Sequence, residues 1–85
     1  MYWSLELGSA NSMNMCPLDN LVDHPIETRA HAIEIAKAYI TENRLGPSLY
    51  VRFARLHESN GKTDRVVWDA ADDPDPAFSE WRSSK

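Results

Sequence analysis

The stretch "LYVRFARLHESNGKTDRVVWDA", residues 49–70, decides the fold because it predicts a β-hairpin. Two runs rich in β-branched and aromatic residues, 48–58 and 63–70, lie on either side of Asn60-Gly61. An Asn-Gly pair between such runs is typical of a two-residue type I′ turn, because both of its residues tolerate a positive φ. We therefore expect two antiparallel strands joined at this point.

A turn centred on Asn60-Gly61 also predicts which residues of the two strands lie opposite each other. Phe53 then faces Trp68, and Arg52 faces Asp69. Paired large aromatics and paired opposite charges both favour this register. The face that carries Phe53 and Trp68 is expected to point toward the core.

A helix is predicted over residues 28–44, with Thr28 as its N-cap. "DHP" at 23–25 offers an alternative, earlier start with Pro25 in the first turn. The C-terminal side of the helix carries Gly46, expected in the left-handed conformation, and then Pro47, which cannot continue a helix. The apolar residues recur every three or four positions, as on one face of a helix. They are Ala32, Ile33, Ala36, Tyr39 and Ile40, with Ile35 at the flank.

Residues 2–7, "YWSLEL", alternate between apolar and polar and predict a first strand, with Trp3, Leu5 and Leu7 facing the core. Residues 8–24 are rich in polar and turn-forming types and are expected to form a long loop. The order strand, loop, helix, hairpin predicts a single small α+β domain of β-α-β-β order. It would hold a mostly antiparallel three-stranded sheet with one helix packed on a face. The neighbour of the first strand in the sheet is left open.

Residues 71–85 are expected to form an acidic tail, and "AADDPDP", residues 70–76, predicts an extended connector into it. Asp75 and Pro76 suit an N-cap followed by a first-turn proline, so a short helix is expected near 76–82. Phe78 and Trp81 lie on one side of that helix, and they serve as anchors either on this domain or on a partner.

The distribution of charge along the chain favours some classes of binding partner over others. The formal net charge of the 85 residues is −4. Residues 1–68 hold eight acids and seven bases, whereas residues 69–85 hold five acids and two bases, a net of −3. This acidity argues against direct nucleic-acid binding, which depends on basic residues at the phosphates. A larger protein or ribonucleoprotein with a basic surface is a better match.

The chain offers little for catalysis, and we expect no enzyme activity, no cofactor and no metal. Cys16, His24, His31 and His57 have no zinc-ligand spacing. The single cysteine fits a reducing compartment, and no run of residues is apolar enough to cross a membrane. We therefore expect a cytoplasmic protein. An enzyme or a metal protein is the least favoured of the functional alternatives.

The sequence predicts two alternative binding surfaces. The first is the acidic C-terminal segment, whose residues would pair with basic groups of a partner and anchor on it. They are Asp69, Asp72, Asp73, Asp75, Glu80, Phe78 and Trp81. The second is a nucleic-acid-binding face of the hairpin that uses Tyr50, Arg52 and Arg65. A homodimer is also compatible with a small sheet that has an unpaired edge.

In its small size, its acidity and its strand–helix–hairpin build, from "YWSLEL" to "VVWDAADD", the chain resembles the small inhibitor proteins of phages and mobile elements, of which anti-CRISPR proteins are the best known. Neither of these two stretches is diagnostic of that group. The resemblance covers the whole chain and is one of format, so no residue role is carried over. It implies a non-catalytic inhibitor that binds a larger nucleic-acid-handling partner. For a phage protein it also implies the cytoplasm of the host cell.

Overall fold

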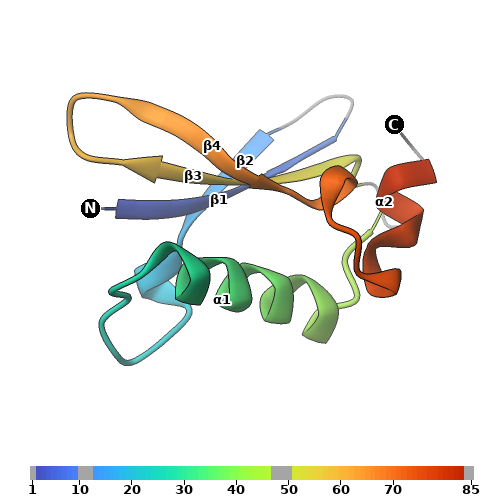
Figure 1. Ribbon diagram of the computed structural model, residues 1–85, viewed down its shortest axis with the longest axis horizontal. Helices are drawn as coiled ribbons and strands as arrows, with labels where there is room; N and C mark the ends of the chain where they lie inside the picture. The colour runs from blue at the N-terminus through green and yellow to red at the C-terminus, as the bar shows by residue number, and fades with distance from the viewer. Residues whose placement is uncertain (1, 10–12, 47–50, 84–85) are drawn as a thin grey trace.

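The computed structural model describes residues 2–9, 13–46 and 51–83 as an α+β domain. Its antiparallel sheet has the order β2-β1-β3-β4, and the main helix covers one face (Figure 1). The predicted fold class is confirmed, but the sheet has four strands rather than three. The strands are β1 (Tyr2–Gly8), β2 (Met13–Pro17), β3 (Phe53–Ser59) and β4 (Asp64–Asp69), and the helices are α1 (Arg29–Glu42) and α2 (Ser79–Ser83).

The additional strand, β2, lies within the stretch 8–24 that was expected to be a loop. It runs antiparallel to β1, with Cys16 opposite Leu5, and its residues are mostly exposed. A strand at the edge of a sheet has one neighbour and needs little apolar surface, so its five residues show only the short alternation of Met13, Asn14 and Met15. A 3₁₀ turn, η1 (Leu18–Asn20), follows and buries Leu18 completely. β1 therefore lies inside the sheet, between β2 and β3.

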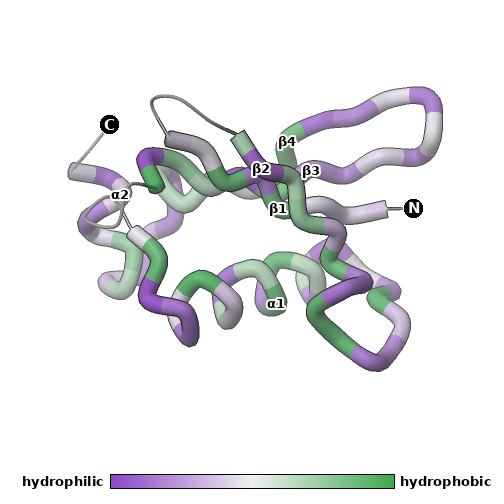
Figure 2. The backbone as a smooth tube through the Cα atoms, turned by 180° about the vertical axis from the view of Figure 1, so that it is seen from behind, coloured by the Kyte–Doolittle hydropathy of each residue, from purple (hydrophilic) through white to green (hydrophobic). Residues whose placement is uncertain are grey.

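The turn between β3 and β4 is longer than predicted. It spans Asn60 to Thr63, and the Oδ1 atom of Asn60 accepts hydrogen bonds from the backbone N–H groups of Lys62 and Thr63, both at 2.9 Å. Gly61 has a φ of 90°, the conformation that glycine supplies without strain. The asparagine side chain thus closes a four-residue loop in place of a two-residue turn. The hairpin tip extends beyond the helical layer and is mainly hydrophilic (Figures 1 and 2).

The longer loop changes the strand register that the sequence predicted. Leu56 lies opposite Trp68, and Asp69 lies opposite Arg55 rather than Arg52. A β-bulge between Leu56 and His57 then shifts the pairing by one residue. The predicted Arg52–Asp69 pair is therefore wrong, and Arg55 takes the acidic partner instead.

The faces of β3 are also the reverse of those predicted. Ala54 and Leu56 are completely buried, opposite Leu7 and Leu5 of β1, whereas Phe53 lies on the other face of the sheet. Each face of β3 carries apolar side chains, so the two-residue period of the strand could not show which face is buried. The match with the leucines of β1 places Ala54 and Leu56 inside.

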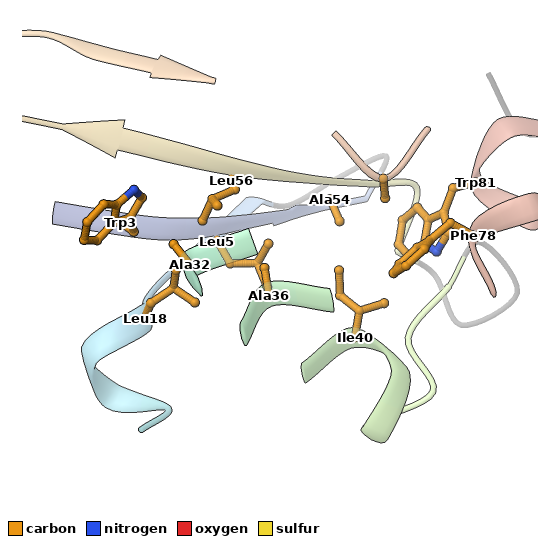
Figure 3. Close-up of a cluster of buried hydrophobic side chains, with 11 residues drawn as sticks. Trp3, Leu5, Leu18, Ala32, Ala36, Ile40, Ala54, Leu56, Phe78 and Trp81 are labelled. Atoms are coloured by element: carbon orange, nitrogen blue, oxygen red, sulfur yellow. The ribbon is translucent and has the colours of Figure 1, made fainter. Parts of the chain in front are cut away.

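The core lies between the sheet and α1. Thr28 is the N-cap, as predicted, and its Oγ1 accepts from the His31 N–H at 3.1 Å. Ala32, Ala36 and Ile40 face the sheet and are buried (Figure 3). The two alanines allow the helix to lie close to the strands, since they present only a methyl group.

α1 ends in a Schellman motif that the sequence did not predict. The Leu45 N–H donates to the Ile40 carbonyl at 3.0 Å, and the Arg44 N–H donates to the Thr41 carbonyl at 3.2 Å. Arg44, with a φ of 54°, takes the left-handed position that was expected of Gly46. The expected stop at Pro47 lies outside the described residues, as does the start of the predicted strand at 48–50.

Candidate protein-binding site at the edge of β4

The acidic segment after β4 folds back onto the domain instead of extending as a tail. It forms two 3₁₀ turns, η3 (Ala70–Asp72) and η4 (Pro76–Phe78), before α2. Phe78 and Trp81 are 1% and 3% exposed, at the end of the core where Ile40 lies (Figure 3). Both rings therefore anchor the segment to this domain. The prediction that they anchor a partner is wrong for this arrangement, because neither is accessible.

Two of the predicted partner-binding acids act as caps. Asp69 accepts a hydrogen bond from the Ala71 N–H, and Asp75 accepts one from the Ala77 N–H, each at 2.9 Å. The N-cap role predicted for Asp75 is confirmed. Asp69 also forms an ion pair with Arg55 at 3.4 Å. These acids start the turns that bring the segment back to the core.

Asp73 is the most buried of the predicted acids, at 8% exposure. It accepts from the Trp68 Nε1–H and from the Asp75 N–H, both at 2.8 Å, and it lies 3.3 Å from the Lys37 Nζ. Burial opposes its ionisation, but these donors outweigh burial and hold the pKa of Asp73 below its ordinary value. Asp73 is therefore a structural carboxylate.

Cations from two helices hold the same segment in place. Lys37 on α1 lies 3.3 Å from Asp73 and 3.4 Å from Asp75. Partial burial opposes its charge, but the two carboxylates raise the pKa of Lys37 above its ordinary value. Arg82 on α2 donates to the backbone carbonyls of Asp73 and Asp75. Much of the local negative charge is thus used inside the domain.

Asp72 and Glu80 are the two predicted partner-binding acids that remain exposed. Asp72 borders a hollow of about 350 Å³ at the outer edge of β4, formed by residues 66–69 and 72–74. Val66, 47% exposed, contributes apolar surface to it, together with half-buried Val67 and Trp68. The hollow therefore combines an apolar strand edge with carboxylates.

The edge of β4 also carries backbone groups suited to binding a further strand. β4 pairs with β3 and is the last strand in the sheet order. Among the described ranges 2–9, 13–46 and 51–83, no strand pairs with its other side. Unpaired N–H and C=O groups on such an edge can receive an extended peptide.

The sequence did not predict a second charged cluster, formed by His57, Glu6 and Asp64. His57 lies between the two carboxylates on the face of the sheet opposite α1, with Nε2 2.6 Å from Glu6 and Nδ1 2.7 Å from Asp64. Glu6 is only 7% exposed. The signal in the sequence is the single acid on the outer side of the first strand, which becomes meaningful once β3 is known to be its neighbour.

The residues of the alternative nucleic-acid face are not brought together. Arg52 precedes β3, whereas Arg65 lies opposite Glu58 near the other end of that strand. Arg65 is 3.7 Å from Glu58, which also accepts two hydrogen bonds from Arg29. Tyr50 lies outside the described residues. The predicted platform of an aromatic ring between arginines is therefore not assembled by the part of the chain that the structure describes.

The candidate metal ligands are also separate. Cys16 lies on β2, and the rings of His24 and His31 stack with centroids 5.1 Å apart. Within residues 2–9, 13–46 and 51–83, no group of three His, Cys, Asp or Glu side chains could hold a metal ion. In the same ranges no helix is long and apolar enough to cross a membrane.

Comparison of the chain with known protein families, with curated proteins and with solved structures finds no significant match.

Proposed function

We propose that the protein is a non-catalytic inhibitor that binds a larger, basic, nucleic-acid-handling partner. The hollow at the edge of β4 is the observation that carries this proposal, because it joins an apolar strand edge to exposed and half-exposed carboxylates. The binding mode is addition of an extended basic segment of the partner beside β4. Its backbone pairs with β4, its apolar side chains contact Val66 and Val67, and its Lys or Arg side chains reach Asp72.

The charge of the C-terminal region supports a basic partner. Residues 69–85 carry a net charge of −3, and their acids are held close together by the capping turns. Fixed carboxylates cost less ordering entropy on binding than carboxylates on a disordered tail. A partner surface that normally holds phosphates has the complementary charge, and occupying it would exclude nucleic acid.

A peptide titration tests the binding mode. The probe is an eight-residue peptide that alternates lysine and valine, compared with the same peptide methylated on alternate backbone nitrogens. We expect amide chemical shifts of residues 64–69 to move with the first peptide and not with the second, because methylation removes the strand donors. Equal shifts with both peptides, or shifts confined to other elements, would overturn the strand-addition mode.

Charge reversal tests the acidic contact without disturbing the internal carboxylates. Asp72→Lys is expected to weaken binding of the unmodified peptide by about tenfold. Asp23→Lys is the matched control, since Asp23 is an exposed acid before α1, and it should leave the affinity unchanged. Inhibition itself is tested with a partner captured by the wild-type protein and not by Asp72→Lys. The wild-type protein must displace nucleic acid from that partner, and failure to do so contradicts the inhibitor role.

A further inference from the structure

A second hollow, formed by other residues than the one beside β4, lies along α1. It holds about 450 Å³ between one flank of the helix and residues 20–22, at the end of η1. The helix contributes Ile35, Ala38, Tyr39 and Glu42. Because these positions are three and four residues apart, they form one stripe that extends for about 10 Å along the helix axis. We call this hollow the α1 groove.

The walls of the α1 groove are mostly apolar. Leu21, Ile35 and Tyr39 are half-buried and pack against the core, and half-buried Val22 adds to the same wall as Leu21. Ala38 is exposed and presents only a methyl group, which leaves room for an approaching side chain. Since the core already holds the larger side chains, an occupant would pay little entropy to order them. A mostly apolar cleft of this size with a few polar groups is typical of a binding site.

The α1 groove offers side chains, and hardly any backbone groups, to an occupant. The N–H and C=O groups in the middle of α1 are bonded within the helix. In the opposite wall, the Leu21 N–H donates to the Leu18 carbonyl at 2.9 Å. An extended segment would lose the hydration of its backbone here without gaining hydrogen bonds in return. A helix satisfies its own backbone groups, so the groove favours a helical occupant.

The rim of the α1 groove is acidic. Glu42 lines the groove, and Glu34 lies about two turns earlier on the exposed side of α1. Asp19 and Asp23 are exposed and lie on either side of residues 20–22 in the sequence. Among the described residues, none forms an ion pair with any of these four acids.

The basic residues of α1 do not neutralise this rim. Arg29 is bonded to Glu58, and Lys37 is held by the two acids that fix the C-terminal segment. Residues 1–28 contain neither lysine nor arginine. The groove therefore joins apolar walls to uncompensated negative charge, which is complementary to an apolar surface flanked by basic side chains.

We propose that the α1 groove binds a basic amphipathic helix of a partner protein. Apolar side chains of that helix, three and four residues apart, enter between residues 20–22 and α1. Its lysine or arginine side chains reach Glu34 and Glu42 at the rim. This site is separate from the edge of β4, and the proposal does not rest on the function proposed above.

A titration with a designed peptide tests the proposal. The probe is a peptide of about eighteen residues, made of leucine, alanine and lysine, with the leucines on one face of a helix. We expect its helicity to increase on binding, measured by circular dichroism, and the amide chemical shifts of residues 20–22 and 35–42 to move. A peptide of the same composition in shuffled order, and one with glutamate in place of lysine, should each bind at least about tenfold more weakly. Equal binding by either control, or shifts confined to other residues, would overturn the proposal.

Ala38→Lys tests the groove on the side of the protein. It places an ammonium group in the middle of the groove, where it repels the basic peptide and pairs with Glu34 and Glu42, each four residues away. The same pairs stabilise the helix, so the variant retains the fold, and the affinity should fall by at least about tenfold. Ala30→Lys, at an exposed position of α1 outside the groove, is the matched control and should change the affinity by less than about threefold. Unchanged affinity in Ala38→Lys contradicts the proposal.

Two comparisons separate this site from the edge of β4 and from self-association. Asp72→Lys should weaken binding of the strand-forming peptide of lysine and valine and leave the helical peptide bound, whereas Ala38→Lys should do the reverse. If the helical peptide does not bind and the strand-forming peptide does, the proposal for the α1 groove alone is wrong. Movement of the same amide signals when the protein is concentrated without peptide would assign the groove to a second copy of the chain and overturn the proposal.

Discussion

The Nε2 atom of His57 lies 2.6 Å from Oε1 of Glu6, and its Nδ1 atom lies 2.7 Å from Oδ1 of Asp64. Carboxylates accept hydrogen bonds, so this geometry favours the imidazolium form, in which both ring nitrogens donate. Arg55 is the other charged group that approaches Glu6, at 4.0 Å. The charged ring therefore joins β1, β3 and the start of β4.

This arrangement predicts that the domain loses stability as the pH rises. Burial opposes the charged ring, but the hydrogen bonds to Glu6 and Asp64 outweigh burial and raise the pKa of His57 above 6.5. The contribution is fully present below the unfolded-state pKa of about 6.5 and is lost as pH rises through the higher folded-state value. Each unit of the increase is worth about 1.4 kcal/mol. Urea unfolding at about pH 6 and about pH 8 measures it.

The matched variant for this prediction is His57→Gln, which retains hydrogen-bonding groups but does not titrate. The difference in unfolding free energy between wild type and variant should decrease from the lower to the higher pH. A difference that is constant over this range would show that His57 titrates as it does in the unfolded chain.

Gly8 packs closely against Phe53 on the face of the sheet opposite α1. A Cβ atom at this position would lie 1.9 Å from Cζ of Phe53, which is far inside contact distance. We expect Gly8→Ala to lower the unfolding free energy by about 1–3 kcal/mol, because the ring must move. Combining it with Phe53→Ala should cost less than the sum of the two single changes. Additive losses in chemical denaturation would place the ring elsewhere.

The left-handed residue that ends α1 offers a stabilising substitution. Arg44 has a φ of 54°, a conformation that favours glycine. Arg44→Gly should raise the unfolding free energy by about 0.5–1 kcal/mol, because relief of backbone strain exceeds the added entropy of the unfolded chain. Asn43→Gly, one position earlier at a negative φ, is the control and should not stabilise. A higher melting temperature for Asn43→Gly than for Arg44→Gly would contradict the Schellman geometry.

The C-terminal aromatic residues should behave as core residues. Phe78→Ala removes a ring that is 1% exposed and packs edge-to-face on Trp68, and we expect it to cost about 3–5 kcal/mol. That loss is comparable to the whole free energy of unfolding of many small domains, so a large fraction of the variant molecules should be unfolded. Phe53→Ala, at a half-buried position, should be milder. Thermal unfolding followed by circular dichroism ranks the two, and equal melting temperatures would argue against a docked segment.

The sequence predicted elements with strong local signals and missed those that depend on distant partners. Thr28 and Asp75 were recognised as caps because their hydrogen bonds lie within a few residues of sequence. The core faces of β1 and α1 followed from regular apolar spacing. β2 was missed because its stability comes from pairing with β1, and its five residues give only a short alternation next to a proline.

The candidate site was predicted less well, for a related reason. The acids after β4 were identified as a group, but sequence alone could not show that Lys37 pairs with the carboxylates of Asp73 and Asp75 inside the domain. Phe78 and Trp81 were recognised as anchors, but the sequence did not show whether they pack on this domain or on a partner. The register of β3 decides which face of the sheet carries Phe53. A four-residue turn closed by Asn60 forms in place of the predicted two-residue turn, and Phe53 lies on the face opposite the predicted one.

The core brings together residues far apart in the sequence, since Trp3 belongs to β1 and Trp81 to α2. A ribosome releases Trp3 early, but β3, which pairs with the strand of Trp3, follows only about fifty residues later. Trp81 lies on α2, which follows β4 in the chain and so is added later still. Vectorial synthesis therefore offers no stable partial domain, and the chain must fold in one late, cooperative step. The nascent strands are therefore exposed to proteases and chaperones until α2 has left the exit tunnel.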